Sequence, residues 1–102
     1  MVARVTRYRG GVAPLSDGLW QTRRVLETKP GSMGVEYLID TRGGLALTIS
    51  LWESMAMAEA SAEWADAARH RTAEALGLTI ENVDVFDLAL RAQVAPSSGS
   101  VV

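Results

Sequence analysis

One apolar stripe of the helix predicted over residues 54–76 could form the wall of a binding pocket. Trp64 and Met57 lie on this stripe, because seven residues are about two turns of an α-helix. Small side chains on the same segment would leave room beside the indole ring for a planar ligand; they are Ala60, Ser61, Ala65 and Ala68. The alternative is ordinary packing between helix and sheet, in which large aromatic residues and methionine are common. The pattern therefore indicates either a pocket for a planar molecule or a core.

Hydrogen-bonding side chains on the predicted strands could complete such a pocket. Arg4 and Thr6 share one face of the first strand, and an inward Arg4 could meet an anionic ligand, although arginine at the end of a sheet is commonly solvated. Tyr37 on the second strand could donate a hydrogen bond to a phenol or quinone oxygen. No catalytic residue stands out. We predict a candidate substrate pocket whose members are Trp64, Thr6, Tyr37, Trp52, Met57 and Arg4.

The inventory of metal-binding and nucleophilic residues is short. The chain has no cysteine and one histidine, His70, which excludes a disulfide framework, a thiolate metal site and a multi-histidine site within one chain. His70 lies six residues after Trp64, so it is displaced by about 120° around the helix, toward the predicted acidic face. We therefore expect a surface histidine, no metal and no cofactor.

The amino-acid composition disfavours some classes of binding partner. The 102 residues are 48% hydrophobic and carry 10 basic and 12 acidic side chains, for a net charge of -2. This balance disfavours a general nucleic-acid or acidic-membrane binder. No apolar run approaches the roughly 20 residues of a membrane span, and the absence of cysteine fits a reducing compartment. We expect a cytoplasmic protein with neither nucleic acid nor membrane as partner.

Alternating and helical periodicities divide the chain into six elements. Ser16 and Ser54 stand at expected helix N-caps, Gly77 at a helix end, and Gly43-Gly44 at a hairpin turn. The predicted order is a strand over 2–9, a helix over 16–28, strands over 33–40 and 45–53, a helix over 54–76, and a strand over 82–90. Residues 1–92 form one predicted domain, and residues 93–102 form a tail rich in Pro, Ser and Gly.

This β-α-β-β-α-β order predicts a ferredoxin-like α+β fold. Right-handed crossovers place both helices on one face of a four-stranded antiparallel sheet. The other face is bare and carries apolar rows too large to leave in water, so we predict a homodimer through the helix-free face. RNA-binding domains share this element order, but the aromatic stacking residues of their central strands are missing here.

Two short segments give the chain a family resemblance. Pro30-Gly31-Ser32-Met33-Gly34 is similar to a Pro-Gly-aromatic-x-Gly pattern at the start of a second strand, with Ser32 in place of the aromatic residue. Trp52-Glu53-Ser54 stands where the third strand meets the second long helix. With the element order over residues 2–91, the chain resembles the antibiotic biosynthesis monooxygenase-like family of dimeric α/β barrels. The resemblance implies that fold and a homodimer.

The activities found in this family are diverse, so the resemblance leaves the chemistry open. Some members are cofactor-free monooxygenases of aromatic polyketides, others are quinol oxygenases, and others degrade haem. Haem-degrading members use an asparagine on the first strand, where this chain has Thr6, and a histidine on the second helix, where His70 faces outward. The resemblance therefore does not imply haem chemistry here.

Two hypotheses remain for the function. The first is a small-molecule-binding or non-catalytic dimeric module, favoured because the inward helix face carries no titratable group. The second is a cofactor-independent monooxygenase acting on a planar aromatic, polyketide- or quinol-like substrate in a pocket between helices and sheet. In that case the substrate anion itself would reduce oxygen, and the protein would supply orientation and hydrogen bonds. Whether the chain is an enzyme stays open at this point.

Overall fold

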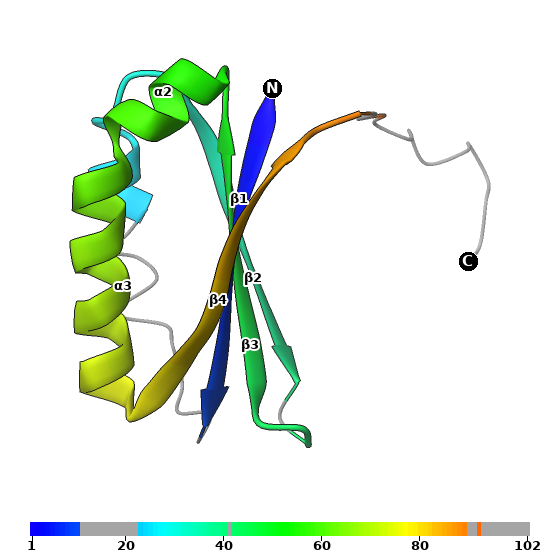
Figure 1. The fold of residues 1–102 in the computed structure, drawn as a ribbon, viewed down its shortest axis with the longest axis vertical. Coiled ribbons are helices and arrows are strands. Elements are labelled where there is room, and N and C mark those ends of the chain that lie inside the picture. The colour runs from blue at the N-terminus through cyan, green and yellow to red at the C-terminus, as the bar shows by residue number, and fades with distance from the viewer. Residues whose placement is uncertain (11–22, 41, 90–91, 93–102) are drawn as a thin grey trace, which may run out of the picture.

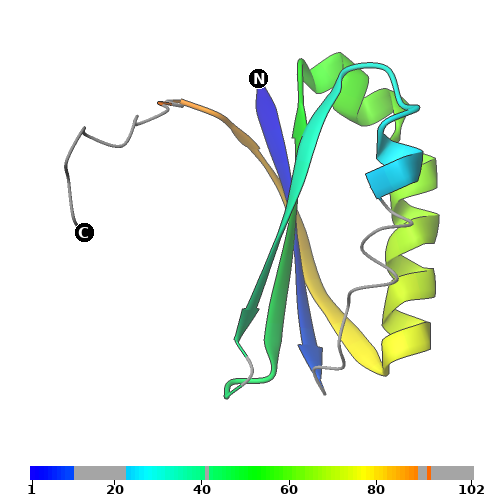
Figure 2. The same cartoon turned by 180° about the vertical axis from the view of Figure 1, so that it is seen from behind.

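The computed structural model describes residues 1–10, 23–40, 42–89 and 92. Among them, four strands form one antiparallel sheet in the order β2-β3-β1-β4. The strands are β1 (Val2–Gly10), β2 (Ser32–Asp40), β3 (Leu45–Trp52) and β4 (Leu78–Asp87). Helices α2 (Met55–Ala60) and α3 (Ala62–Leu76) lie on one side of this sheet (Figures 1 and 2). The predicted ferredoxin-like fold is confirmed.

The predicted helix over residues 16–28 is described only at its end. Residues 23–26 are helical, and Leu26 is buried against the sheet. Residues 16–22 of that prediction lie outside the described residues, as does the predicted tail over 93–102.

The helix predicted over residues 54–76 is broken at Ser61. Its ends are as expected: the Ser54 hydroxyl accepts a hydrogen bond from the Met57 N–H, and Gly77 closes α3 in the left-handed conformation at φ 66°. At the break, the Ser61 hydroxyl donates to the Ala58 carbonyl at 2.8 Å, which competes with continued helical bonding. Periodicity alone did not predict this interruption, and it changes which residues face the sheet.

Strand β4 begins four residues earlier than predicted, directly after Gly77. The left-handed glycine turns the chain straight from α3 into the strand. Arg7 pairs with Asn82 and Tyr8 with Ile80, so Glu81 is an extra, bulged residue. This bulge interrupts the alternation over residues 78–82, which explains why the sequence pattern places the start of the strand at residue 82.

The two segments that carry the family resemblance meet in space. The Glu53 N–H donates to the Gly31 carbonyl at 2.8 Å. Gly31 has φ 79°, and a Cβ there would lie 2.6 Å from Cβ of Met57. Glycine is therefore required at this position both by the backbone conformation and by the close approach of α2.

Buried apolar residues form two separate clusters between the sheet and the helices. One consists of Val2, Leu26, Trp52 and Ala58, with Val35 and Trp64 packed against it. The other is centred on Tyr8 and Ala46, with Tyr37, Ala73, Leu76, Leu78 and Ile80 packed against it. The described part of the core is thus divided, and the residues between its two halves are largely polar.

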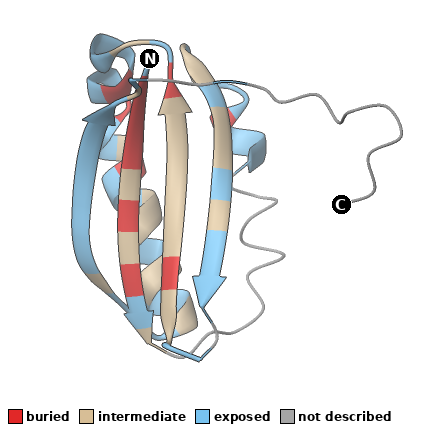
Figure 3. Cartoon of the chain, turned by 90° about the vertical axis from the view of Figure 1, so that its right-hand side faces the viewer, coloured by how far each residue is buried: buried red, intermediate tan, exposed pale blue. Residues whose placement is uncertain are grey.

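The opposite face of the sheet carries an apolar surface that no described residue covers (Figure 3). Strand registers place a row of β3 side chains there with neighbours from the other strands; the surface consists of Ala3, Val5, Leu38, Leu45, Leu47, Ile49, Leu51 and Phe86. Leu38 is 50% exposed and Phe86 is 54% exposed. We call this set the outer sheet face.

Candidate functional site

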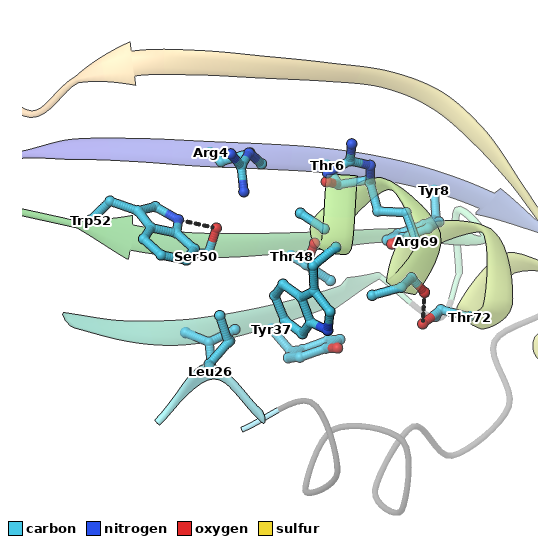
Figure 4. A pocket seen from close by; sticks show the side chains of 14 residues that line it. Arg4, Thr6, Tyr8, Leu26, Tyr37, Thr48, Ser50, Trp52, Arg69 and Thr72 are labelled. Atoms are coloured by element: carbon cyan, nitrogen blue, oxygen red, sulfur yellow. Dashed lines mark hydrogen bonds between the residues drawn. The ribbon is translucent and has the colours of Figure 1, made fainter. Parts of the chain in front are cut away.

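A cavity separates the two apolar clusters on the helix-covered face of the sheet (Figure 4). Its volume is about 50 Å³, several times the roughly 10–15 Å³ needed for one water molecule. Its lining residues come from β1, β2, β3, α3 and the helical segment 23–26: Arg4, Thr6, Tyr8, Leu26, Val35, Tyr37, Thr48, Ser50, Trp52, Trp64, Ala65, Ala68, Arg69 and Thr72.

The centre of the sheet is polar where a packed core would be apolar. Thr6 is 2% exposed and pairs with Thr48 on β3, while Arg4 pairs with Ser50. Sheet positions beneath a helix usually carry large aliphatic side chains that fill the space between the layers. Short hydroxyl side chains leave that space open and supply hydrogen-bonding groups to whatever fills it. The composition of this layer favours a binding site over a core.

Arg4 is held beneath the break between α2 and α3. Its guanidinium donates hydrogen bonds to the Ala58 carbonyl and, at 3.4 Å, to the Ser61 hydroxyl. The guanidinium carbon lies 5.5 Å from the centre of the Trp52 ring. Arg4 is only 7% exposed, so the solvated alternative is wrong. The Ala58 carbonyl near the end of α2, which also accepts from the N–H and hydroxyl of Ser61, provides a buried acceptor for this charge.

The two tryptophans beside the cavity differ in burial. Trp52 is completely buried, and its Nε1–H donates to the Ser50 hydroxyl at 2.9 Å. Trp64 on α3 is partly buried, and the Lys29 ammonium lies 5.1 Å from its ring centre. Both rings line the cavity, but Trp52 is completely buried within one apolar cluster, whereas Trp64 is partly exposed and packs against that cluster.

Five of the six predicted pocket residues meet at this cavity: Arg4, Thr6, Tyr37, Trp52 and Trp64. Met57 does not line it. Met57 lies on α2, is 38% exposed, and is directed toward Gly31. The break at Ser61 is the reason, because the stripe of α3 does not continue in phase into α2. Ala60, expected on the same stripe, is exposed and Ala58 is buried instead, whereas Ser61 and Ala65 are buried, as expected.

Sequence reasoning missed several polar residues of the cavity: Tyr8, Thr48, Ser50, Arg69 and Thr72. Arg69 and Thr72 follow Ala65 by four and seven residues, so they share its face of α3. That spacing could have placed both residues on the cavity side of the helix, but a charged residue such as Arg69 is ordinarily expected to face solvent. Figure 4 shows Arg69 extending from α3 toward β1, near Thr6.

Ionisable side chains that commonly act as bases or metal ligands are absent from the described lining. Those residues include no aspartate, glutamate or histidine. His70 is exposed, as predicted, and its Nδ1 lies 2.9 Å from the Asp66 carbonyl oxygen. Within residues 1–10, 23–40, 42–89 and 92, no group of three acidic or histidine side chains could hold a metal ion. Nor is any helix in those ranges long and apolar enough to cross a membrane.

The phenol of Tyr8 keeps its proton well above neutral pH. Burial, and to a lesser extent the neighbouring Tyr37, raise the pKa of Tyr8 to about 12, against the opposing influence of Arg69 and of a hydrogen bond with Thr48. Tyr8 is 3% exposed, which agrees with burial as the main cause. At neutral pH it therefore offers the cavity a hydrogen-bond donor rather than a negative charge.

The raised pKa of Tyr8 predicts a loss of stability at high pH. Between pH 10 and about 12, tyrosine in the unfolded chain loses its proton while Tyr8 in the folded chain retains it. Its contribution to stability is complete below pH 10 and is lost across that window, by about 2–3 kcal/mol at roughly 1.4 kcal/mol per unit of pKa shift. Denaturant melts of the wild type and Tyr8→Phe at several pH values measure this loss of stability. Parallel pH profiles for the two proteins would contradict the assignment.

Comparison with known proteins identifies the fold. Among solved structures, a protein of Deinococcus radiodurans provisionally assigned as an antibiotic biosynthesis monooxygenase superposes with a TM-score of 0.70, at 13% identity, over 93% of this chain and 99% of that one. The chain has the antibiotic biosynthesis monooxygenase fold. SnoaB, a cofactor-independent oxygenase of Streptomyces nogalater, matches at 21% identity over 94% of this chain and 97% of its own, with a TM-score of 0.64. An asparagine-to-alanine variant of SnoaB gives a TM-score of 0.66.

The comparisons with sequence-based collections are negative. No protein-family model matches the chain, and no curated protein matches it. The likeness to the antibiotic biosynthesis monooxygenase fold therefore rests on three-dimensional arrangement, and it establishes architecture rather than activity.

Proposed function

We propose that this protein binds a small planar aromatic molecule in the cavity between α3 and the sheet. The observation that carries the proposal is the polar layer of Thr6, Thr48 and Ser50, which separates two apolar clusters. A core filled only by protein would leave this space unpacked. A ligand with an apolar ring and a polar substituent satisfies both parts of this lining.

The cavity volume limits the ligand to one ring at most. A volume of about 50 Å³ corresponds to a few water molecules and lies below the roughly 150 Å³ of a cavity that encloses benzene, so a bound ring would also occupy the open mouth of the cavity. Leu26, Val35 and Trp64 supply apolar contacts on one side, and the hydroxyl side chains of β1 and β3 lie on the other. We therefore propose a phenol or benzoate-sized ligand.

We further propose a homodimer through the outer sheet face. Leu45, Leu47, Ile49 and Leu51 form an apolar row along β3, inside the sheet rather than at its edge. Charged side chains lie around this row: Arg7 and Arg9 contact Glu81 at one side, and Glu36 and Asp40 lie on β2. An apolar centre with a polar rim is the usual composition of a protein interface, and a second copy of the same face buries it most simply.

A cofactor-independent oxygenase is the second candidate function, favoured by the similarity to SnoaB over 94% of this chain. A phenolic substrate with a ring CH₂ group would react with O₂ so that one oxygen atom forms a ring carbonyl and the other leaves as water. The substrate supplies all four electrons, and its two methylene hydrogens end in the water. Because the described lining residues include no carboxylate or imidazole base, the binding function is the better supported of the two.

Calorimetric titration with benzoate and phenol tests the binding function. We expect saturable binding with a stoichiometry of one ligand per chain. If neither compound binds at millimolar concentration, the proposed function is wrong. Oxygen consumption measured with hydroquinone, a single-ring compound, then separates the two candidates, since a binding module does not consume oxygen above the buffer rate.

A further inference from the structure

Two positively charged side chains share the cavity, and the described lining contains no negative charge. Arg4 projects from β1 and is 7% exposed; the Arg69 side chain projects from α3 and is 14% exposed. Burial and the positive charge of Arg69 lower the pKa of Arg4. Arginine is not deprotonated in folded proteins, so the cavity lining carries two positive charges.

Nearby carboxylates neutralise the positive charges of these two arginines only in part. Asp66 lies 3.4 Å from Arg69, but its side chain is 62% exposed and screened by water. Among the described residues, no carboxylate forms an ion pair with Arg4, whose hydrogen bonds go to a carbonyl and a hydroxyl. The cavity therefore holds two partly desolvated positive charges whose mutual repulsion a bound anion would relieve.

The lining also indicates which kind of anion fits. To bind as an anion, a neutral phenol would have to lose its proton, and the described lining offers no carboxylate or imidazole to accept that proton. A carboxylate is already charged at neutral pH, and its two oxygens match the paired N–H groups of a guanidinium. Tyr8, which stays protonated, supplies a further donor. Leu26 and Trp64 lie where an attached ring would be covered.

We propose that the ligand is an aromatic carboxylate, with its carboxylate directed at Arg69 and Arg4 and its ring packed against Trp64. This inference rests on the proposed binding function and specifies its ligand class. Arg69 is the main determinant of specificity, because Arg4 is already engaged at the end of α2.

The experiment compares benzoate with benzamide, which has nearly the same shape and no charge. For the wild-type protein, we expect calorimetry to give a dissociation constant for benzoate at least about tenfold lower than for benzamide. Arg69→Gln should raise the dissociation constant for benzoate about tenfold and leave that for benzamide unchanged. Arg71→Gln is the matched control, because it removes the same charge from an exposed position of α3.

The outcomes separate this inference from the proposed function. Equal binding of benzoate and benzamide by the wild type overturns the inference and leaves the binding function intact. Equal weakening of both ligands in Arg69→Gln also overturns it. Absence of binding by benzoate and benzamide overturns the inference, and absence of phenol binding as well overturns the proposed function. The wild-type comparison needs no variant, so it decides the charge preference even if Arg69→Gln folds poorly.

Discussion

Replacing Trp52 by alanine is expected to lower the free energy of unfolding by about 3–5 kcal/mol. Trp52 is completely buried, belongs to the apolar cluster with Val2 and Leu26, and donates a hydrogen bond to Ser50. The variant leaves a cavity in a part of the core that cannot collapse easily, which is the usual origin of losses of this size. Urea melts of the two proteins measure it.

Trp64→Ala is the matched comparison, because it deletes the same side chain from the other side of the cavity. Trp64 is partly exposed, whereas Trp52 is completely buried, so fewer packing contacts are lost, and we expect a cost of about 1–2 kcal/mol. Ligand affinity should fall instead. Equal losses of stability in the two variants would indicate that Trp64 is simply part of the core.

Ile49→Glu is expected to convert the proposed dimer to a monomer. Ile49 lies within the outer sheet face, opposite Val5 on one side and Glu36 on the other. In the proposed interface, an added carboxylate would be desolvated without a partner and would face its own copy across a twofold axis. Light scattering should then give half the mass of the wild type at micromolar concentration.

The control for this variant is Ala67→Glu, which adds the same charge at an exposed position of α3. It should leave the mass at that of a dimer. A wild-type protein that is itself monomeric at micromolar concentration would refute the dimer proposal, whatever the variants do.

The strands and their faces were largely predictable from local patterns. Alternation in β1 correctly placed Arg4 and Thr6 on one face, and their burial in the structure shows that this is the helix-covered face. The N-cap at Ser54 and the left-handed glycine at Gly77 were also predictable, because each meets a specific backbone requirement. Such features depend on neighbours in the sequence.

The features that the sequence did not predict depend on contacts between distant residues. The break at Ser61 involves Arg4, which is 57 positions away along the chain. It changes the phase between α2 and α3, removing Met57 from the cavity lining. The bulge at Glu81 is set by the register with β1 and by contacts with Arg7 and Arg9. From the sequence alone, a charged residue such as Arg69 is predicted to face solvent, and only the three-dimensional structure shows the cavity beneath it.

The affinity of Ala68→Leu for benzoate tests most directly whether the cavity is the binding site. Ala68 lines the cavity, and leucine adds three carbon atoms to a space of about 50 Å³. Ala67→Leu makes the same change at the adjacent, exposed position. We predict that Ala68→Leu raises the dissociation constant at least tenfold, with a cost in stability of no more than about 1–3 kcal/mol, while Ala67→Leu binds like the wild type. Wild-type affinity in a folded Ala68→Leu variant would contradict the assignment of this cavity as the ligand site.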